Sequence, residues 1–317
     1  MSSSTNPSTG SIAVVSDKQL GDVTLLEPLT RLLSARAGQP CALYVKDAFR
    51  PLVDLMPQAS WGPGSRSRHA ESWATSWSSR NVMRAFRVPA RRKHLLVNHV
   101  SRPRWWYRFL FHQIRVEPIL LQEYWGHYYW RVFGGEEAGF DGPRLNQPPD
   151  EWRHPSLPDS PYALINPTAA WPNKFWTPEA WAGLLQSSAA SGVTWVMTGG
   201  NSEVEQAHCA AIAAQAPKGL INLSGKTSLK QYMHALSRAQ GVVCVDGSAS
   251  HLAQAFGVPT VVVFGPVAPG KWHWATPRNR AVSAFDFSTE RLPATAEVPV
   301  EPVVQAWCEV MSQPTGH

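Results

Sequence analysis

Short apolar runs alternate with segments of helical spacing near the start of this sequence. Residues 11–15 form an apolar run that ends before Gly21, and residues 23–33 then place leucines at helical spacing. Residues 41–45 form a second apolar run, so the chain opens as strand, glycine turn, helix and strand. This order predicts the beginning of a parallel α/β sheet.

The second half of the chain shows the same alternation more clearly. The pattern predicts strands over 162–166, 193–198, 241–245 and 260–264, and helices over 178–188, 202–215, 229–238, 248–256 and 298–311. Thr177 is the expected N-cap of the first of these helices, with Pro178 in its first turn. The strands are apolar throughout, which indicates a parallel sheet covered on both faces.

Residues 141–161 contain six prolines and are expected to link two domains, because proline blocks both helices and sheet pairing. A linker at this position in a chain of 317 residues predicts two domains, an N-terminal α/β domain over 12–140 and a C-terminal one over 162–317. Residues 1–11 are expected to form a disordered tail. Residues 60–130 show no clear period and are expected to form helices and loops with exposed aromatic side chains. Doubly wound domains bind ligands beyond the carboxyl ends of their strands.

The net charge of +6 lies wholly in the first half of the chain. Residues 161–317 hold nine basic and nine acidic side chains, whereas the stretch from Arg66 to Arg115 holds twelve basic residues against the single acid Glu71. Eleven of those twelve are arginines, which suit phosphate and carboxylate groups. A solvated basic face is one interpretation. The density favours an anionic partner, either nucleic acid or an anionic lipid or phosphorylated glycolipid.

Composition excludes several classes of protein. No stretch approaches the roughly 18 uncharged apolar residues of a membrane-spanning helix, and the first residues do not resemble a secretory signal. The four cysteines lie far apart without metal-ligand spacing, which favours reduced core thiols in a cytosolic protein over disulfides. Collagen, coiled coils, disulfide scaffolds and integral membrane proteins are excluded.

The strongest local signal is VCVDGSASHLAQAFGVPTVVVFGP, residues 243–266. A buried strand leads into Asp246 and a turn of small residues, and a helix then begins with His251 in its first turns. The unpaired N–H groups and the dipole of such a helix start form an anion site. Simple capping by Asp246 and Ser248, with His251 exposed, fits the residues equally well. Neither a Walker A loop nor a G-x-G-x-x-G fingerprint is present.

This segment resembles the nucleotide-diphosphate loop of glycosyltransferase family 9, the lipopolysaccharide heptosyltransferases. Residues 165–185, 196–206 and 221–243 are similar to three further motifs of the family, and Lys174 matches in the first of them. Residues 20–33 resemble the family's opening Leu-Gly-Asp-Val loop. Ser16, Asn166 and the order Gly247-Ser248 depart from the family pattern. The resemblance covers nearly all of residues 162–312.

The resemblance implies the GT-B fold, in which two Rossmann-like doubly wound domains face each other across a cleft. It implies an inverting, metal-independent transfer of a heptose or similar sugar to a lipopolysaccharide-core or related glycan acceptor. The expected donor is a nucleotide-diphosphate sugar, with ADP-heptose as the first candidate, and no cofactor is expected. Asp22 is the expected catalytic base, although its position alone suggests a helix cap. Lys174 and His251 are expected to neutralise the leaving diphosphate, in a chain without an Asp-x-Asp pair for a metal. The expected donor-binding residues are Thr168, Gly199, Gly200, Glu203, Asp246, Gly247, Ser248, Ala249 and Ser250.

The remaining expectations concern partners and alternatives. Arg91, Arg92 and Lys93 are expected to bind an anionic glycolipid or oligosaccharide acceptor. The protein is expected in the cytoplasm, with peripheral contact at the inner face of the inner membrane as an option and no nucleic acid partner. Another GT-B-type enzyme, either a UDP- or GDP-sugar transferase or an epimerase, is one alternative. A noncatalytic descendant that binds sugar nucleotide, or nucleic acid through its arginines, is the other.

Overall fold

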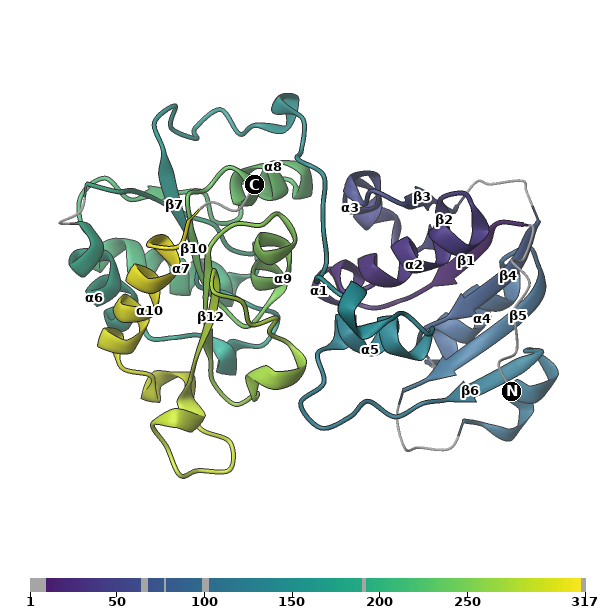
Figure 1. The fold of residues 1–317 in the computed structure, drawn as a ribbon. Helices are drawn as coiled ribbons and strands as arrows, with labels where there is room; N and C mark the ends of the chain where they lie inside the picture. The colour runs from purple at the N-terminus through teal and green to yellow at the C-terminus, as the bar shows by residue number, and fades with distance from the viewer. Residues whose placement is uncertain (1–9, 64–67, 77, 99–102, 190–191, 315–317) are drawn as a thin grey trace. The chain divides into compact units, whose positions relative to one another are not determined.

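The computed structural model describes residues 10–63, 68–76, 78–98, 103–189 and 192–314. The chain divides into two compact units, residues 1–146 and 147–317, and each contains one six-stranded sheet (Figure 1). Residues 1–9 of the predicted tail lie outside the described residues, as do Arg66 and Arg102 of the arginine-rich stretch.

The sheet of unit 1 is parallel throughout and has the strand order β3-β2-β1-β4-β5-β6. Its strands are β1 (Ile12–Val15), β2 (Cys41–Tyr44), β3 (Ala59–Trp61), β4 (His69–Ala74), β5 (Ala90–Val97) and β6 (Gln113–Val116). Its helices are α1 (Leu20–Thr24), α2 (Glu27–Ala37), α3 (Arg50–Leu55), α4 (Ser79–Arg87) and α5 (Trp125–Val132), with a 3-10 helix η2 (Trp105–Phe109).

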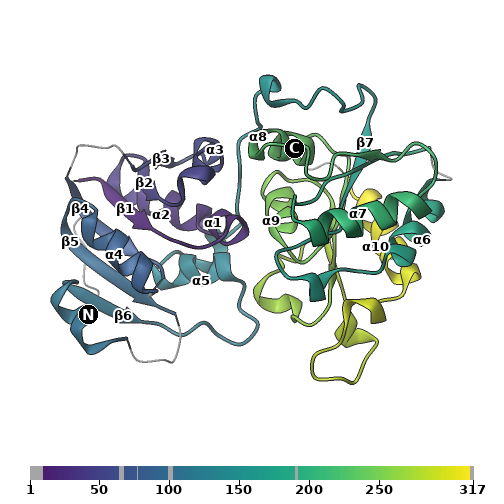
Figure 2. The ribbon, with the colours of Figure 1, turned by 180° about the vertical axis from the view of Figure 1, so that it is seen from behind.

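Helices cover both faces of this sheet. Helices α2 and α5 contact each other over one face, and α4 lies over the other, as the two opposite views show (Figures 1 and 2). The α4 face contains a core of alternate residues of β1, β2 and β5, to which α4 adds Val82 and Ala85, its C-cap adds Val88 and η2 contributes Tyr107. The doubly wound α/β class predicted from the sequence is therefore confirmed for this unit.

The expectation of helices and loops with exposed aromatic side chains over residues 60–130 is right for α4, η2, Trp105 and Phe109, but it missed the strands β4, β5 and β6. These strands lack the apolar signature of the others for a physical reason. Strand β5 begins with Arg91, Arg92 and Lys93, of which the two arginines are exposed, and only its second half is buried. Strand β6 is at the edge of the sheet and is half polar. The single helix expected over 23–33 is instead split between α1 and α2.

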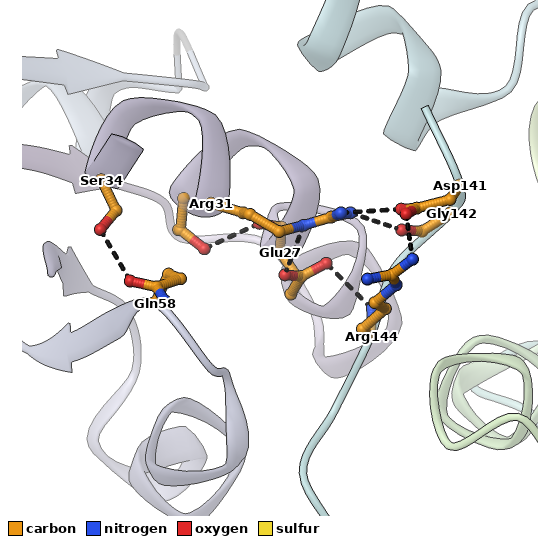
Figure 3. Close-up of polar contacts among 8 residues, drawn as sticks. Glu27, Arg31, Ser34, Gln58, Asp141, Gly142 and Arg144 are labelled. Carbon is orange, nitrogen blue, oxygen red and sulfur yellow. Dashed lines mark hydrogen bonds and ion pairs between the residues drawn. The ribbon is translucent and has the colours of Figure 1, made fainter. Parts of the chain in front are cut away.

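The first part of the proline-rich segment is fixed to unit 1 through a buried carboxylate at the start of α2 (Figure 3). Glu27 is fully buried and accepts hydrogen bonds from Arg31 Nε at 3.2 Å and from the backbone N–H of Arg144 at 2.9 Å. Arg31 also donates to Asp141 Oδ1 at 2.7 Å. Burial raises the pKa of Glu27, and the contacts with Arg31 and Arg144 act in the opposite direction. The boundary between the units falls after Asn146, inside the segment predicted to be the linker.

Unit 2 repeats the topology of unit 1, with a parallel sheet of order β12-β11-β10-β7-β8-β9. Its strands are β7 (Tyr162–Asn166), β8 (Thr194–Met197), β9 (Ile221–Asn222), β10 (Val242–Val245), β11 (Thr260–Phe264) and β12 (Asn279–Ser283). Its helices are α6 (Pro178–Ala189), α7 (Glu203–Gln215), α8 (Leu229–Ser237), α9 (Ser248–Ala255) and α10 (Val300–Met311). The doubly wound prediction is confirmed here too, although the sequence interpretation missed the short β9 and β12.

Several tryptophans of the chain pack in the core of unit 2. Trp176 and Trp181 are fully buried against α10 and the sheet, with their rings 5.2 Å apart, as expected for core residues. Trp195 and Trp307 pack together in the same core. Thr177 caps α6 as predicted, because its hydroxyl accepts the N–H of Ala180 at 3.1 Å.

The cysteines and the helix lengths can be compared with the expectations from composition. Cys41, Cys209 and Cys244 are buried free thiols, and Cys308 is an exposed free thiol rather than a core residue. Among the described residues, no helix is both long enough and apolar enough to span a bilayer.

Candidate functional site

The strand order of unit 2 reverses between β7 and β10, which are direct neighbours in the sheet. Ligands of doubly wound domains bind beyond the carboxyl ends of the strands at such a reversal, because the loops that follow lead away to opposite sides. The loop after β7 leads through the 3-10 helix η5 (Pro172–Lys174), and the loop after β10 contains Asp246. Both loops therefore start at the edge where a ligand is expected.

An ion pair joins these two loops. The Lys174 ammonium lies 2.5 Å from Asp246 Oδ2, and the two side chains are 17% and 5% exposed. Two charges so far removed from water are stable only when they are paired. Lys174 also lies over the ring of Trp171 at 5.1 Å. The pair holds a cation at the carboxyl ends of β7 and β10.

Helix α9 begins at the same edge with Gly247 as its N-cap. Glycine has no side chain with which to cap the helix, so the capping by Asp246 that the sequence allowed is not what the structure shows. A Cβ atom at Gly247 would lie 3.4 Å from Ala169 Cβ, so the start of α9 contacts the loop after β7. The side chain of Ser248 hydrogen-bonds to Tyr232, and the Ser250 hydroxyl donates to Gly247 O at 2.7 Å. Ala249 and Ser250 are buried. The arrangement leaves the positive end of the α9 dipole at the ligand edge.

His251 is only 4% exposed, so the sequence alternative of an exposed histidine is wrong. Its ring centroid lies 6.4 Å from that of Trp272, just beyond the 3-10 helix η6 (Pro269–Lys271). His251 is the fourth residue of α9, so it belongs to the first turn of that helix.

The loop after β8 completes this edge. Thr168 is buried, and its hydroxyl oxygen accepts the N–H of Gly200 at 3.2 Å, which ties the loop after β7 to the loop after β8. Gly199 packs so closely that a Cβ there would lie 3.2 Å from the Thr168 hydroxyl. Asn166, which departs from the motif noted in the sequence, donates to Thr198 Oγ1 at 3.0 Å and so links β7 with β8.

The sequence interpretation selected Glu203 for this loop but missed Glu205. Glu203 is exposed at the first position of α7, whereas Glu205 is half-buried and bonds to the Ser202 hydroxyl at 2.6 Å in a capping box. Burial raises the pKa of Tyr232, the residue that also contacts Ser248, and the negative charge of Glu205 adds to this shift. The Ser-x-x-Glu spacing was the signal that could have identified it, because a capping box folds its glutamate back over the helix start.

Asp22 occupies the corresponding edge of unit 1, where the strand order reverses between β1 and β4. It is the third residue of α1, and its Oδ2 atom accepts the N–H of Gln19 at 3.3 Å, so it caps the helix. It is half-buried, and its charge contributes to raising the pKa of the buried Tyr129. Ser16, another departure from the motifs noted in the sequence, is buried directly after β1. Asp22 is a cap and also lies at the ligand edge.

Three arginines of α4 line a cavity of about 450 Å³ in unit 1. Arg80, Arg84 and Arg87 are spaced by four and three residues, which places them on one face of the helix. The rest of the lining is Tyr44, Met83, Val88 and Pro89. Helix α4 follows β4, so it starts at the edge where Asp22 lies, and Arg84 Nη1 donates to Ser16 O at 3.4 Å. The sequence interpretation did not single out these arginines.

Arg91, Arg92 and Lys93 are not brought together with Asp22. They lie at the beginning of β5, and parallel strands begin at the edge opposite to the one where they end. Within the parts of the chain that the structure describes, no group of three His, Cys, Asp or Glu side chains could hold a metal ion.

Comparison with known proteins agrees with the fold. A profile of glycosyltransferase family 9 (heptosyltransferase) matches residues 132–299, more than half of the chain. Lipopolysaccharide heptosyltransferase 1 of Pseudomonas aeruginosa is 31% identical over 115 residues, which is 36% of this chain. The match spans only 31% of the length of that relative.

Two solved structures resemble nearly the whole chain. The family 9 glycosyltransferase of Veillonella parvula has a TM-score of 0.81 at 16% identity, with 97% of this chain and 98% of that chain covered. E. coli ADP-heptose LPS heptosyltransferase II has a TM-score of 0.76 at 18% identity, with 95% and 98% covered. At these identities the likeness shows the fold, which is the expected GT-B fold. Because the family profile spans more than half of its length, the chain belongs to glycosyltransferase family 9, the heptosyltransferases.

Proposed function

We propose that this protein transfers a heptose or a similar sugar from ADP-heptose to an anionic glycan acceptor of the lipopolysaccharide-core type, with inversion at the anomeric carbon. The observation that carries the proposal is the Lys174–Asp246 pair beside the start of α9, at the strand reversal of unit 2. Membership of the heptosyltransferase family supports the sugar, and the similarity to an ADP-heptose enzyme supports the nucleotide.

The donor diphosphate is bound at the start of α9. The backbone N–H groups of residues 248–250 and the helix dipole favour a dianion, and Lys174 and His251 lie at the same edge. Thr168, Gly199 and Gly200 shape the neighbouring loop, and Glu205 replaces Glu203 as the acidic residue proposed to contact the nucleoside. Charge on the leaving diphosphate is neutralised by these fixed groups, and the reaction requires neither a metal nor a cofactor.

Asp22 is the proposed general base. The acceptor hydroxyl gives its proton to the Asp22 carboxylate while its oxygen forms a bond to the anomeric carbon, and the bond from that carbon to the phosphate oxygen breaks. ADP departs with the electron pair of that bond. Unit 1 thus supplies the base, and unit 2 supplies the donor site.

The α4 cavity is the proposed acceptor subsite. Guanidinium groups bind phosphate and carboxylate bidentately, which suits an anionic inner-core glycolipid. The cavity replaces Arg91, Arg92 and Lys93 as our candidate, because its Arg84 donates to Ser16 O beside the end of β1, at the edge that carries Asp22. From there the lining continues along α4 to Pro89, just before β5.

The deciding experiment compares Asp22→Asn with Asp47→Asn, a control carboxylate in the first turn of another helix of unit 1. Asparagine keeps an oxygen that can accept the Gln19 N–H, so the cap survives, but it cannot take a proton. We expect transfer from ADP-heptose to an anionic inner-core glycolipid to fall by about 10²- to 10⁴-fold in Asp22→Asn. ADP affinity, measured by calorimetry with EDTA present, should stay within a few-fold of wild type.

Three outcomes would contradict the proposal. Full turnover in Asp22→Asn would mean that another group is the base. Loss of ADP binding on adding EDTA would contradict the metal-independent donor site. A thermal-shift panel in which UDP or GDP stabilises the protein more than ADP would favour the UDP- or GDP-sugar alternative, because a ligand that binds only the folded state raises Tm.

A further inference from the structure

The basic residues at the beginning of β5 take no part in the proposed reaction. Immediately before the next strand, η2 places two large aromatic side chains in solvent, because Trp105 and Phe109 are each 70% exposed. The two segments are neighbours, since the N–H of His112 donates to Lys93 O at 2.7 Å and the N–H of Lys93 donates to His112 Nδ1 at 3.1 Å. We call Arg91, Arg92, Lys93, Trp105, Arg108 and Phe109 the amino-edge surface.

The aromatic residues of this surface are held outward by the fold. Within η2, Tyr107 is 1% exposed and packs into the core of unit 1, which turns Trp105 and Phe109 away from it. The Arg108 guanidinium lies 5.6 Å from the Trp105 ring and 5.0 Å from the Phe109 ring. Exposing two such rings to water is unfavourable, and contiguous exposed apolar groups often mark an interaction site.

The charge of the region restricts the partner to an anionic one. From residue 72 to residue 116 the sequence contains no Asp or Glu. Glu71, the nearest acid before that stretch, lies 4.0 Å from His94 Nε2. Arg91, Arg92 and Arg108 are exposed. Burial, and in second place the positive charge of Arg68, lowers the pKa of Lys93.

The aromatic geometry separates a membrane from nucleic acid. Bases of a single strand stack on flat, accessible ring faces. Here the Trp105 and Phe109 rings are perpendicular, at 86° and 5.9 Å, and Arg108 lies over both, so they do not form such a platform. Aromatic rings with arginines around them suit the interface of a bilayer instead, where the rings lie among headgroups and the guanidinium groups reach the phosphates.

We propose that the amino-edge surface docks this protein onto an anionic lipid bilayer, with Trp105 and Phe109 inserted among the headgroups. This goes beyond the proposed transfer and does not rest on it, because neither the donor nor the acceptor takes part. The arginines supply attraction to the negative surface, and the two rings supply apolar burial.

The test is flotation of the full chain with vesicles of phosphatidylcholine, either pure or containing 30% phosphatidylglycerol, without donor or acceptor. We expect binding to the anionic vesicles only. The variant R91Q/R92Q/R108Q should lose about fivefold in partitioning for each charge removed, or roughly 100-fold in all. W105S/F109S should lose roughly tenfold or more. Melting curves of the variants should match wild type, because all five side chains are exposed.

Two matched controls make the result specific. K218Q/K230Q/R291Q removes the same charge from exposed positions of unit 2 and should bind as wild type does. R91K/R92K/R108K keeps the charge and should also bind, because lipid attraction needs charge rather than guanidinium geometry. Equal losses in K218Q/K230Q/R291Q and R91Q/R92Q/R108Q would overturn the proposal. So would unchanged binding of W105S/F109S, or binding to a single-stranded oligonucleotide but not to vesicles.

Discussion

Removing the ammonium of Lys174 should both destabilise unit 2 and weaken donor binding, and the structure allows the two effects to be separated. Lys174→Met keeps the length of the side chain but leaves the Asp246 carboxylate, 5% exposed, without its cation at 2.5 Å. A buried carboxylate without a partner is costly. The double variant Lys174→Met/Asp246→Asn removes both charges and therefore most of this cost.

The size of the effect follows from the exposure of the pair. Breaking a fully buried ion pair costs about 3–5 kcal/mol. Lys174 is 17% exposed, so water can partly replace the ammonium, and we expect Lys174→Met to lose about 2–3 kcal/mol of unfolding free energy. For a unit of this size that is a fall in Tm of roughly 5–10 °C. The double variant should lie within about 1 kcal/mol of wild type.

Urea unfolding followed by tryptophan fluorescence measures the stability, because unit 2 buries several tryptophans, and calorimetry measures the affinity for ADP. Lys226→Met is the control, since Lys226 is exposed in the same unit and should change stability by less than about 0.5 kcal/mol. Donor binding should stay weak in the double variant although its stability recovers. A Lys174→Met protein as stable as wild type would refute the ion-pair argument, and a double variant with wild-type ADP affinity would refute the role of Lys174 at the donor.

Two further predictions concern the acceptor and the pH dependence of stability. R80Q/R84Q should raise the KM for the anionic glycolipid at least about tenfold and leave ADP affinity unchanged. R91Q/R92Q, assayed with detergent-dispersed acceptor, should leave this KM unchanged. A KM raised by R91Q/R92Q but not by R80Q/R84Q would support the acceptor site predicted from the sequence instead. Burial lowers the pKa of His273 to about 4, so the folded state binds fewer protons than the unfolded chain as pH falls below about 6.5. Stability should therefore fall by about 2 kcal/mol between pH 7 and pH 5, and urea titrations of His273→Gln should lack this part of the slope.

The sequence predicts unit 2 well because its strands are buried on both faces. Strand β10 is apolar at every position and β11 at every position after Thr260. Helix α6, which follows β7, starts at a clear cap, Thr177. The same rule fails for β5 and β6, where polar residues occupy strand positions because one end or one edge of the sheet is exposed. A pattern based on burial cannot detect strands that are stabilised chiefly by pairing with their neighbours.

The candidate site shows the same limit. The sequence pattern identified the segments that carry Lys174, Asp246 and Asp22, because each follows a predicted strand or glycine turn. It could not show that Lys174 and Asp246 form a pair, since 72 positions separate them and only the adjacency of β7 and β10 brings them together. It also grouped all the arginines of residues 66–115 into one surface, whereas α4 and the beginning of β5 present theirs at different places on unit 1.

The pairing of Lys174 with Asp246 also explains why the proposed donor site carries a carboxylate where a diphosphate is expected. Alone, Asp246 would repel the diphosphate, but with the ammonium at 2.5 Å the pair is formally neutral. Attraction in the ground state then comes mainly from the start of α9, whose N–H groups are already oriented. As the leaving diphosphate gains charge in the transition state, it competes with Asp246 for the ammonium more strongly than the bound donor does. Stabilisation of this kind raises kcat, so Lys174→Met should lower kcat by a larger factor than it lowers ADP affinity. Equal factors in single-turnover and calorimetric measurements would show that Lys174 binds donor and transition state alike.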